Sequence, residues 1–528
     1  MNTLRELEGM QFEFGAGRAE SRQRCLEELA RARLRSARDV ARLHELALFA
    51  SSVPDSPGVL ASARALLARF AQRADLRRFR SELADSGIAG TPIRFQFFHP
   101  TAARLARAFP DALQIDWEAW DEEQHARLEA LLPLLVRASE ANTELDARGW
   151  LASARKRGEA EGAFLARRFG ELGASVDVRA QLWDGLDPWL RLEPRPGGPS
   201  RTLGRADWLP VHFQRQPLRR ERPDLRAAAR IPPRSIVRVR GARARALLRL
   251  AQDAMAARSR DLDAFMHADA RDVRLIDCGE GLCCAMFGVL PAQRLPLESV
   301  HAFLTLKNGV PIGYVLASAF LGSCEVAYNV FETWRGAEAA HVYGRVLAML
   351  RALYGADSFT IDPYQLGHEN EEGIASGAWW FYQKLGFRPD ARGVRALMRR
   401  ELARGPGMRS SPATLRKLAR APLFFFLGRE RADVLGRFPL ERVSSAALRE
   451  LARHGSEAQC ARAAGVPRAC ERWAPILCAL RGVERWSAAL RVARLRGAVD
   501  ELRYVRALQA HRQLRRALCA LARVRSSV

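Results

Sequence analysis

The sequence predicts an α+β protein in which a strand-rich central region lies between two largely helical regions. From about residue 20 to residue 83 apolar side chains recur every three or four positions, as they do on buried helix faces. Beyond residue 232 the period shortens to the alternation typical of strands, and past residue 407 it returns to helical spacing. The chain has 528 residues, 48% of them hydrophobic, which is enough for roughly three or four domains with packed cores.

Residues 1–231 form the first expected region, which is largely helical. A short β-rich run at 91–98 interrupts the helical pattern, which then continues to about residue 172. Proline and glycine cluster at 194–199, and four prolines accompany two adjacent arginines and little apolar content between 217 and 233. We therefore expect a Pro/Arg-rich linker at the end of this region.

Residues 232–402 alternate between strands and helices. Asn308-Gly309 lies between two apolar runs and is the strongest short hairpin signal, because both residues tolerate the positive φ of a type I′ turn. Gly279-Glu280-Gly281 predicts a second hairpin in the same way. The expected strands are 235–239, 273–276, 282–289, 301–307, 310–321, 324–331, 358–361 and, as a closing strand, 394–401, and the expected helices are 242–258, 338–354 and 371–384.

Residues 403–528 are expected to be a basic helical region. They carry 26 basic and 9 acidic side chains, about two-thirds of the net charge of +25. Such a region either binds an anionic partner, such as nucleic acid or an anionic membrane, or presents a solvated face on a helical domain. The arginines spread over its last helical turns are Arg491, Arg494, Arg496, Arg503 and Arg506.

Composition also bears on compartment and metals. The nine cysteines include no CxxC pair, and the first twenty residues lack the apolar segment of a secretory signal, so we expect a cytoplasmic protein. The longest apolar stretch, 421–428, is too short to cross a bilayer, so no transmembrane segment is expected. The spacing of His454, Cys460, Cys470 and Cys478 matches no compact zinc template, and no metal site is predicted.

Two motifs in the central region bear on chemistry. Thr333-Trp334-Arg335-Gly336-Ala337 follows an expected strand and precedes an expected helix, an arrangement in which backbone N–H groups and the helix dipole can hold a phosphate. Such a turn is also common without any ligand. Further on, Asn370 is placed to cap a helix that has acidic residues in its first turn, and Phe381 to Phe387 read FYQKLGF.

These motifs resemble the GNAT superfamily of acyl-CoA-dependent N-acyltransferases, whose fourth motif reads as an Asn-capped helix followed by a FYxKLGF-like turn. The resemblance covers about residues 235–402, is sharpest over 307–389, and extends to neither flank. It implies a mixed sheet with helices on both faces, splayed between the strands at 324–331 and 358–361. It also implies acetyl-CoA or another acyl-CoA as co-substrate, with the acyl-pantetheine arm in the splay.

The resemblance also implies roles for particular residues. Tyr382 matches the tyrosine that donates a proton to the departing CoA thiolate in many members, a general-acid role that a phenol can fill. Asn370 matches a polar residue near the cofactor arm. The pyrophosphate loop would consist of Arg335, Gly336, Ala337, Glu338, Ala339 and Ala340. From its place at the end of a strand, Glu332 is the candidate base for the attacking amine, although it is as well explained as a surface carboxylate.

One position departs from the family pattern. Glu338 stands where the loop usually has a central glycine, and a carboxylate beside a pyrophosphate is repulsive. Three functions are therefore expected as alternatives. The chain is an N-acyltransferase that moves an acyl group from acyl-CoA to an amine acceptor, or a catalytically degenerate GNAT-fold binding or scaffold protein, or a binder of anionic polymers through residues 403–528. Nothing in the sequence specifies the acceptor amine.

Overall fold

The computed structural model describes two compact units. The first consists of residues 1–218, 245–267 and 307–311, and the second of residues 219–244, 268–306 and 312–528. Residues 403–528 thus share a unit with most of the central region, and nearly all of the predicted linker at 217–233 belongs to that unit as well. The described residues are 2–15, 17–136, 145–405, 407, 409–480, 487–524 and 526.

The first unit is helical, as predicted, with one small sheet. Its three strands pair in the order β1-β3-β2, and β3 is antiparallel to both neighbours. The sheet and the helices between its strands enclose an apolar core that includes Phe164, Phe169 and Trp183. The elements are α1 (Asn2–Gly9), α2 (Arg18–Arg31), α3 (Ala37–Ser52), α4 (Pro57–Ala68), η1 (Phe70–Gln72), α5 (Ala74–Arg78), β1 (Ile93–Phe95), α6 (His99–Ala108), β2 (Leu113–Ile115), η2 (Trp117–Ala119), α7 (Glu122–Leu135), α8 (Ala147–Ala154), α9 (Glu161–Glu171), α10 (Val176–Leu186), β3 (Leu190–Leu192) and α13 (Asp263–Met266).

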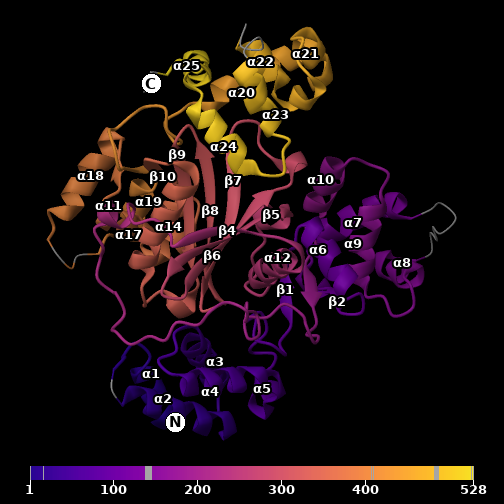
Figure 1. The fold of residues 1–528 in the computed structure, drawn as a ribbon. Helices are drawn as coiled ribbons and strands as arrows, with labels where there is room; N and C mark the ends of the chain where they lie inside the picture. The colour runs from indigo at the N-terminus through magenta and orange to yellow at the C-terminus, as the bar shows by residue number, and fades with distance from the viewer. Residues whose placement is uncertain are drawn as a thin grey trace. The chain divides into compact units, whose positions relative to one another are not determined.

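The second unit is built on a nine-stranded mixed sheet. Its strand order is β11-β12-β10-β9-β8-β7-β6-β5-β4, and Figure 1 shows the long central strands side by side. β9 and β10 run parallel, whereas β10 and β12 run antiparallel. The protein is therefore a mixed α/β structure with a large mixed sheet. The strands are β4 (Ser235–Val239), β5 (Ala268–Gly279), β6 (Leu282–Val289), β7 (Ser299–Lys307), β8 (Val310–Phe320), β9 (Ser323–Val330), β10 (Ser358–Ile361), β11 (Arg388–Pro389) and β12 (Leu423–Phe426).

Helices fill the connections of this unit and most of the chain that follows the sheet. α12 begins in the second unit and continues into the first. The elements are α11 (Leu225–Ala228), α12 (Gly241–Ala256), η4 (Pro291–Gln293), η5 (Glu332–Trp334), α14 (Ala339–Tyr354), α15 (Pro363–Leu366), α16 (Glu371–Ser376), α17 (Ala378–Lys384), α18 (Arg392–Leu402), α19 (Pro412–Leu418), α20 (Leu440–His454), α21 (Glu457–Ala463), η6 (Arg468–Trp473), α22 (Ala474–Ala479), α23 (Ser487–Leu495), α24 (Glu501–Ala510) and α25 (Arg512–Leu521).

Most strand predictions for this unit are confirmed. The strands expected at 235–239 and 358–361 have those bounds, and the one expected at 324–331 is shifted by one residue. Asn308 and Gly309 have φ values of 49° and 81°, the positive values that the hairpin between β7 and β8 requires.

Two expected elements of this unit were wrong. Residues 394–401 form α18 instead of a closing strand, because their apolar side chains recur at helical spacing. The helix expected over 371–384 is two helices, since Gly377 adopts φ 67° and ends α16. The closing strand is β12, which lies beyond the predicted boundary at 402 and pairs with both β10 and β11.

The parallel pair β9 and β10 opens at one end. Only Ser323, Cys324 and Glu325 pair with β10, while β9 continues to Val330 along β8. Beyond Glu325, therefore, the last five residues of β9 have no partner strand on the β10 side. This leaves a gap at the end of the parallel pair.

The chain after β12 is tied to the sheet. Leu435 bridges the parallel pair, because its N–H donates to Ser323 Oγ at 3.0 Å and its carbonyl accepts from Thr360 Oγ1 at 2.8 Å. Further along, Arg496 is 2% exposed and forms an ion pair of 2.9 Å with the buried Glu501. Arg496 also donates to the carbonyls of residues 295 and 298. The C-terminal helices are thus part of the folded sheet unit.

Candidate functional site

A cavity of about 260 Å³ lies at the gap beside β9. Tyr328 and Asn329 line it from β9, Ala339 from the first turn of α14, and Tyr382 from α17. Successive side chains of a strand alternate between its faces, so Tyr328 and Asn329 approach the cavity from opposite faces of the sheet. Such lining is possible because β10 has already ended at this level. The other lining residues are Val330, Arg335, Gln365, Asn370, Glu372, Gly373, Ser376, Ala378 and Phe381.

Tyr382, the candidate general acid, lines this cavity. Its side chain is 3% exposed and packs edge-on against Tyr343 and Phe387, at ring distances of 5.5 and 5.7 Å. Burial raises the pKa of Tyr382 well above its ordinary value, and a hydrogen bond from the Tyr328 backbone opposes this only in part. The phenol is therefore protonated at neutral pH and can act as a hydrogen-bond donor.

Asn370 caps α16, as its place in the sequence predicted. Its Oδ1 accepts from the Gly373 N–H at 3.2 Å, and its Nδ2 donates to the Tyr364 carbonyl at 3.0 Å. Asn370 also lines the cavity. Two hydrogen bonds in opposite directions fix the amide, so Asn370 positions the start of α16 at the cavity wall.

The turn that precedes α14 lies beside the cavity, but only its ends line it. Arg335 and Ala339 are lining residues, whereas Gly336, Ala337 and Ala340 are not. The Arg335 guanidinium donates to Glu372 at 2.6 Å and to the Val330 carbonyl at 3.2 Å. The N–H groups of the first helical turn have no acceptors within the helix, so the start of α14 offers donors to an anion.

Glu338 is directed away from this cavity. It is the residue before α14, and its carboxylate accepts a hydrogen bond of 3.0 Å from the Arg219 N–H. Glu338 does not line the cavity. The repulsion that the sequence suggested between this carboxylate and a pyrophosphate is therefore reduced by its orientation.

Glu332, the candidate base, lies apart from the cavity that Tyr382 and Asn370 line. It lies in η5 with an exposed side chain and does not line the cavity. Sequence reasoning missed a second carboxylate, Glu325, at the last paired position of β9. Burial raises the pKa of Glu325 to about 7, and the nearby carboxylates of Asp362 and Glu298 contribute to the rise. The sequence signal that could have identified Glu325 is its position as an acidic residue within a largely apolar strand.

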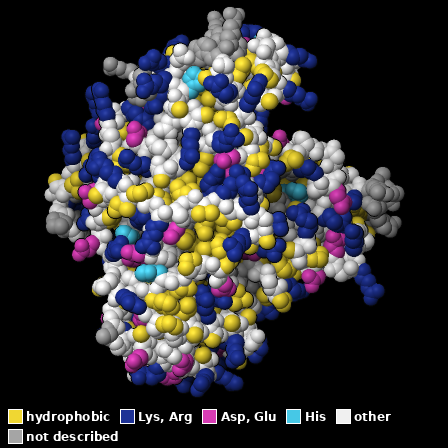
Figure 2. All heavy atoms as spheres, in the orientation of Figure 1, with side chains coloured by type: hydrophobic (Ala, Val, Ile, Leu, Met, Phe, Trp, Pro, Cys, Tyr) yellow, Lys and Arg dark blue, Asp and Glu magenta, His cyan; other side chains and the backbone are white. Residues whose placement is uncertain are grey.

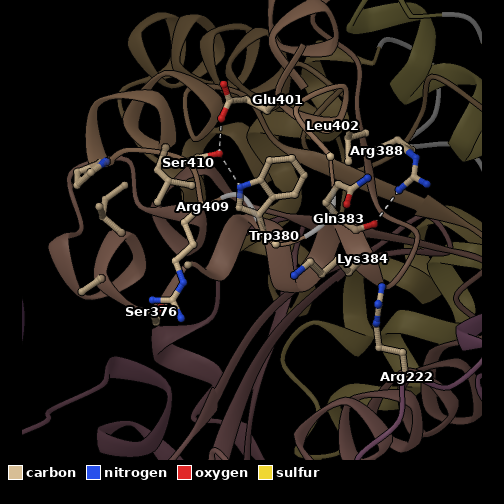
Figure 3. A pocket seen from close by; sticks show the side chains of 17 residues that line it. Arg222, Ser376, Trp380, Gln383, Lys384, Arg388, Glu401, Leu402, Arg409 and Ser410 are labelled. Carbon is tan, nitrogen blue, oxygen red and sulfur yellow. Dashed lines mark hydrogen bonds between the residues drawn. The ribbon is translucent and has the colours of Figure 1, made fainter. Parts of the chain in front are cut away.

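A second cavity, of about 1190 Å³, is also lined from α16 and α17, by Trp380 and Lys384 among others, and Figure 3 shows the side chains around it. Ser376 lines both cavities. Trp380 lines the second cavity, whereas the adjacent Trp379 is fully buried, because neighbouring residues on a helix point in different directions. No residue of the turn at 335–340 lines it.

The basic charge of residues 403–528 is used in part inside the fold. Arg496 is buried in the ion pair described above, and Arg506 donates to the Leu353 carbonyl. Arg491, Arg494 and Arg503 are exposed. Figure 2 shows basic side chains distributed over the face it displays, more widely than acidic ones. Some of the basic residues that were expected to bind an anionic partner therefore make contacts within the fold instead.

Among the described residues, no group of three or more His, Cys, Asp or Glu side chains is arranged to hold a metal ion. Within the same ranges, none of the helices combines the length and the apolar character needed to span a bilayer. Cys278, Cys283 and Cys284 are buried in β5 and β6, where they pack as small core residues.

Comparisons with known proteins add no neighbour. No protein-family model, no curated protein and no solved structure matches the chain.

Proposed function

We propose that the protein is an N-acyltransferase that moves an acyl group, acetyl in the simplest case, from acyl-CoA to an amine. The observation that carries the proposal is the cavity at the open end of the β9–β10 pair. It combines a buried, protonated phenol, Tyr382, with the start of a sixteen-residue helix, α14. The FYQKLGF motif that resembles the GNAT superfamily supplies that phenol.

The donor would enter this gap with its pyrophosphate at the start of α14. Backbone N–H groups of the first turn and the positive end of the helix dipole favour a phosphate there. The cavity, at about 260 Å³, is below the ~300 to 1,000 Å³ of pockets that enclose whole ligands. It therefore suits the acyl-pantetheine arm better than the entire donor. The orientation of Glu338 toward Arg219 is compatible with this placement.

The chemistry requires a donor for the leaving thiolate and an acceptor for the amine proton. Tyr382 is the donor, since its raised pKa keeps the phenol protonated and the residue lines the cavity. A hydrogen bond to the thiolate stabilises the charge that develops as the thioester bond breaks. The amine attacks the acyl carbon, the carbon–sulfur bond breaks, and the amine proton passes to a base.

We assign the base to Glu325 instead of Glu332. Neither carboxylate lines the cavity. Glu332 is exposed, whereas Glu325 is half-buried on β9 where the strands separate, on the same face as the lining residue Asn329. With a pKa raised to about 7, Glu325 exchanges a proton readily at neutral pH. The acidic neighbours Asp362 and Glu298 also favour a cationic acceptor.

The test is calorimetric titration of the purified protein with acetyl-CoA and a longer acyl-CoA, followed by thiol release with a panel of amines. Tyr382→Phe is expected to retain binding and to lower kcat by about a hundredfold. Tyr364→Phe is the matched control, because Tyr364 is 54% exposed and does not line the cavity. Unchanged turnover in Tyr382→Phe would show that Tyr382 is not the general acid.

The degenerate binding or scaffold protein is the second candidate, and Glu338 is the observation that favours it. If wild type binds neither thioester and Glu338→Gly does, the scaffold function replaces the acyltransferase. If neither protein binds a thioester, the acyltransferase proposal fails.

A further inference from the structure

The second cavity, which the proposed function does not use, is strongly cationic. Arg222, Lys384 and Arg409 line it and have no ion-pair or hydrogen-bond partner among the described residues. Arg388 also lines it and donates only to the carbonyls of residues 383 and 387. Unpaired cations around a cavity attract an anion, and arginine favours phosphate oxygens in particular.

The carboxylate at this cavity, Glu401, is already engaged. Trp380 Nε1 donates to Ser410 Oγ at 3.1 Å, and Ser410 Oγ donates to Glu401 Oε2 at 2.7 Å. Arg404 donates to the same carboxylate oxygen at 2.7 Å. The hydrogen bonds from Ser410 and Arg404 lower the pKa of Glu401. This chain of donors fixes the indole and offsets the negative charge of Glu401.

The fixed indole forms an aromatic wall inside the cationic cavity. Figure 3 shows Trp380 at the centre, with Arg222, Lys384 and Arg388 on one side and Arg409 on the other. Trp380 is half-buried, its Nε1 is occupied by Ser410, and its ring packs at a steep angle against Trp379 at 4.8 Å, so the part of the indole that faces the cavity is what a ligand can stack on. Aromatic side chains stack on nucleobases, because every base has a π-face.

This cavity is separate from the proposed donor site. Both cavities are lined from α16 and α17, but among its described lining residues only Ser376 is shared with the first cavity. At about 1190 Å³ it has room for a nucleoside phosphate.

We propose that this cavity binds a free nucleotide, with the base stacked on Trp380 and the phosphate held by Lys384 and the surrounding arginines. The inference does not depend on the acyltransferase proposal, since neither Tyr382 nor the turn at 335–340 takes part. The nucleotide portion of CoA has the same chemistry, and the experiment separates the two sources.

The experiment is calorimetric titration of the full chain with AMP, adenosine and ribose 5-phosphate at low and high salt. AMP is expected to bind saturably, and each fragment about tenfold or more weakly, because each lacks either the phosphate or the base. Added salt is expected to weaken the binding of AMP and of ribose 5-phosphate, which carry a charged phosphate, but not the binding of adenosine.

Three variants assign the contacts. Lys384→Gln is expected to lower the affinity for AMP and for ribose 5-phosphate about tenfold and to leave the affinity for adenosine unchanged. Trp380→Leu is expected to lower the affinity for AMP and for adenosine but not for ribose 5-phosphate. Trp380→Phe keeps an aromatic ring and most of the packing, so it is expected to retain most of the affinity. Arg449→Gln is the matched control, because Arg449 is exposed on α20 outside the cavity.

Several results would overturn the proposal. The first is an AMP titration that does not saturate. The second is a loss of AMP affinity in Lys384→Gln that is no larger than the loss in Arg449→Gln. The third is an equal loss of affinity for AMP and for ribose 5-phosphate in Trp380→Leu, provided that this variant has a native circular dichroism spectrum. Displacement of AMP by saturating acetyl-CoA would assign the cavity to the donor's own nucleotide end and would also overturn it. Because no arm of the titration needs acyl transfer, its failure leaves the acyltransferase proposal to its own test.

Discussion

The Tyr328 hydroxyl donates a 3.0 Å hydrogen bond to the backbone carbonyl of Ala339. This bond joins the unpaired end of β9 to the first turn of α14. The Tyr328 ring also lies 5.0 Å from that of Tyr343 on the same helix. One side chain thus holds together the two elements that would carry the acyl arm and the pyrophosphate.

Tyr328→Phe is predicted to destabilise the protein by about 1 kcal/mol, the usual net contribution of one hydrogen bond. The ring packing remains, so the loss reports on the hydroxyl alone. Urea denaturation followed by circular dichroism measures the change, with Tyr364→Phe as the exposed control. A loss of equal size in the control would contradict the role assigned to the bond with Ala339.

Glu325 is predicted to make stability depend on pH. Its pKa is raised to about 7 in the folded protein from an ordinary value of 4.5, so the folded state binds the proton more tightly than the unfolded state. Stability is therefore greatest below about pH 4.5 as far as this group is concerned, and is lost as the pH rises to about 7. Glu325→Gln is expected to be more stable than wild type by about 2 kcal/mol at pH 8, and the gain should shrink toward pH 5.

Urea titrations at several pH values test this, and Glu332→Gln serves as the exposed control. A Glu325→Gln gain that is constant over the whole pH range would show that the carboxyl is not perturbed.

Asn370 is predicted to act through both sides of its amide. Asn370→Ala removes the cap of α16 and should cost about 1 kcal/mol in thermal or urea unfolding. Asn370→Asp keeps the oxygen that accepts from Gly373 but loses the donor to Tyr364, so an intermediate loss is expected. If the two variants lose equally, capping is not the main contribution.

Arg496→Gln is predicted to be the most destabilising of these changes, by about 3 kcal/mol, because it removes one of the two buried arginines that pair with Glu501 and leaves only Arg294, at 3.3 Å. Arg503→Gln, an exposed neighbour, should change stability by less than ~0.5 kcal/mol. The double variant Arg496→Gln/Glu501→Gln is expected to recover part of the loss, which a double-mutant cycle measures. Additive losses would show that the pair is not coupled.

The sequence predicted the central strands well because their signals are local. The Asn308-Gly309 turn and the alternation of 235–239 depend on a few adjacent residues, and both are confirmed. β12 is a different case. Its run of phenylalanines carries no strand period, and its pairing with β10 depends on residues more than sixty positions away.

The site was predictable to a similar extent. Tyr382 and Asn370 belong to a compact motif, and the structure brings both to one cavity. Glu325 was missed because its raised pKa depends on burial and on Asp362 and Glu298, which are distant in sequence. The cationic cavity was missed for the same reason, since the whole of the predicted central region, 232–402, lies between Arg222 and Arg409 in the sequence.

The sheet of the second unit has a consequence for how the protein is made. Its strand order places β12 between β10 and β11, and the buried Arg496–Glu501 pair lies later still in the chain. During synthesis, β10 therefore has an unpaired edge until residue 426 leaves the ribosome. A nascent chain in that state is exposed to aggregation, and we expect its yield to depend on chaperones that shield strand edges during translation.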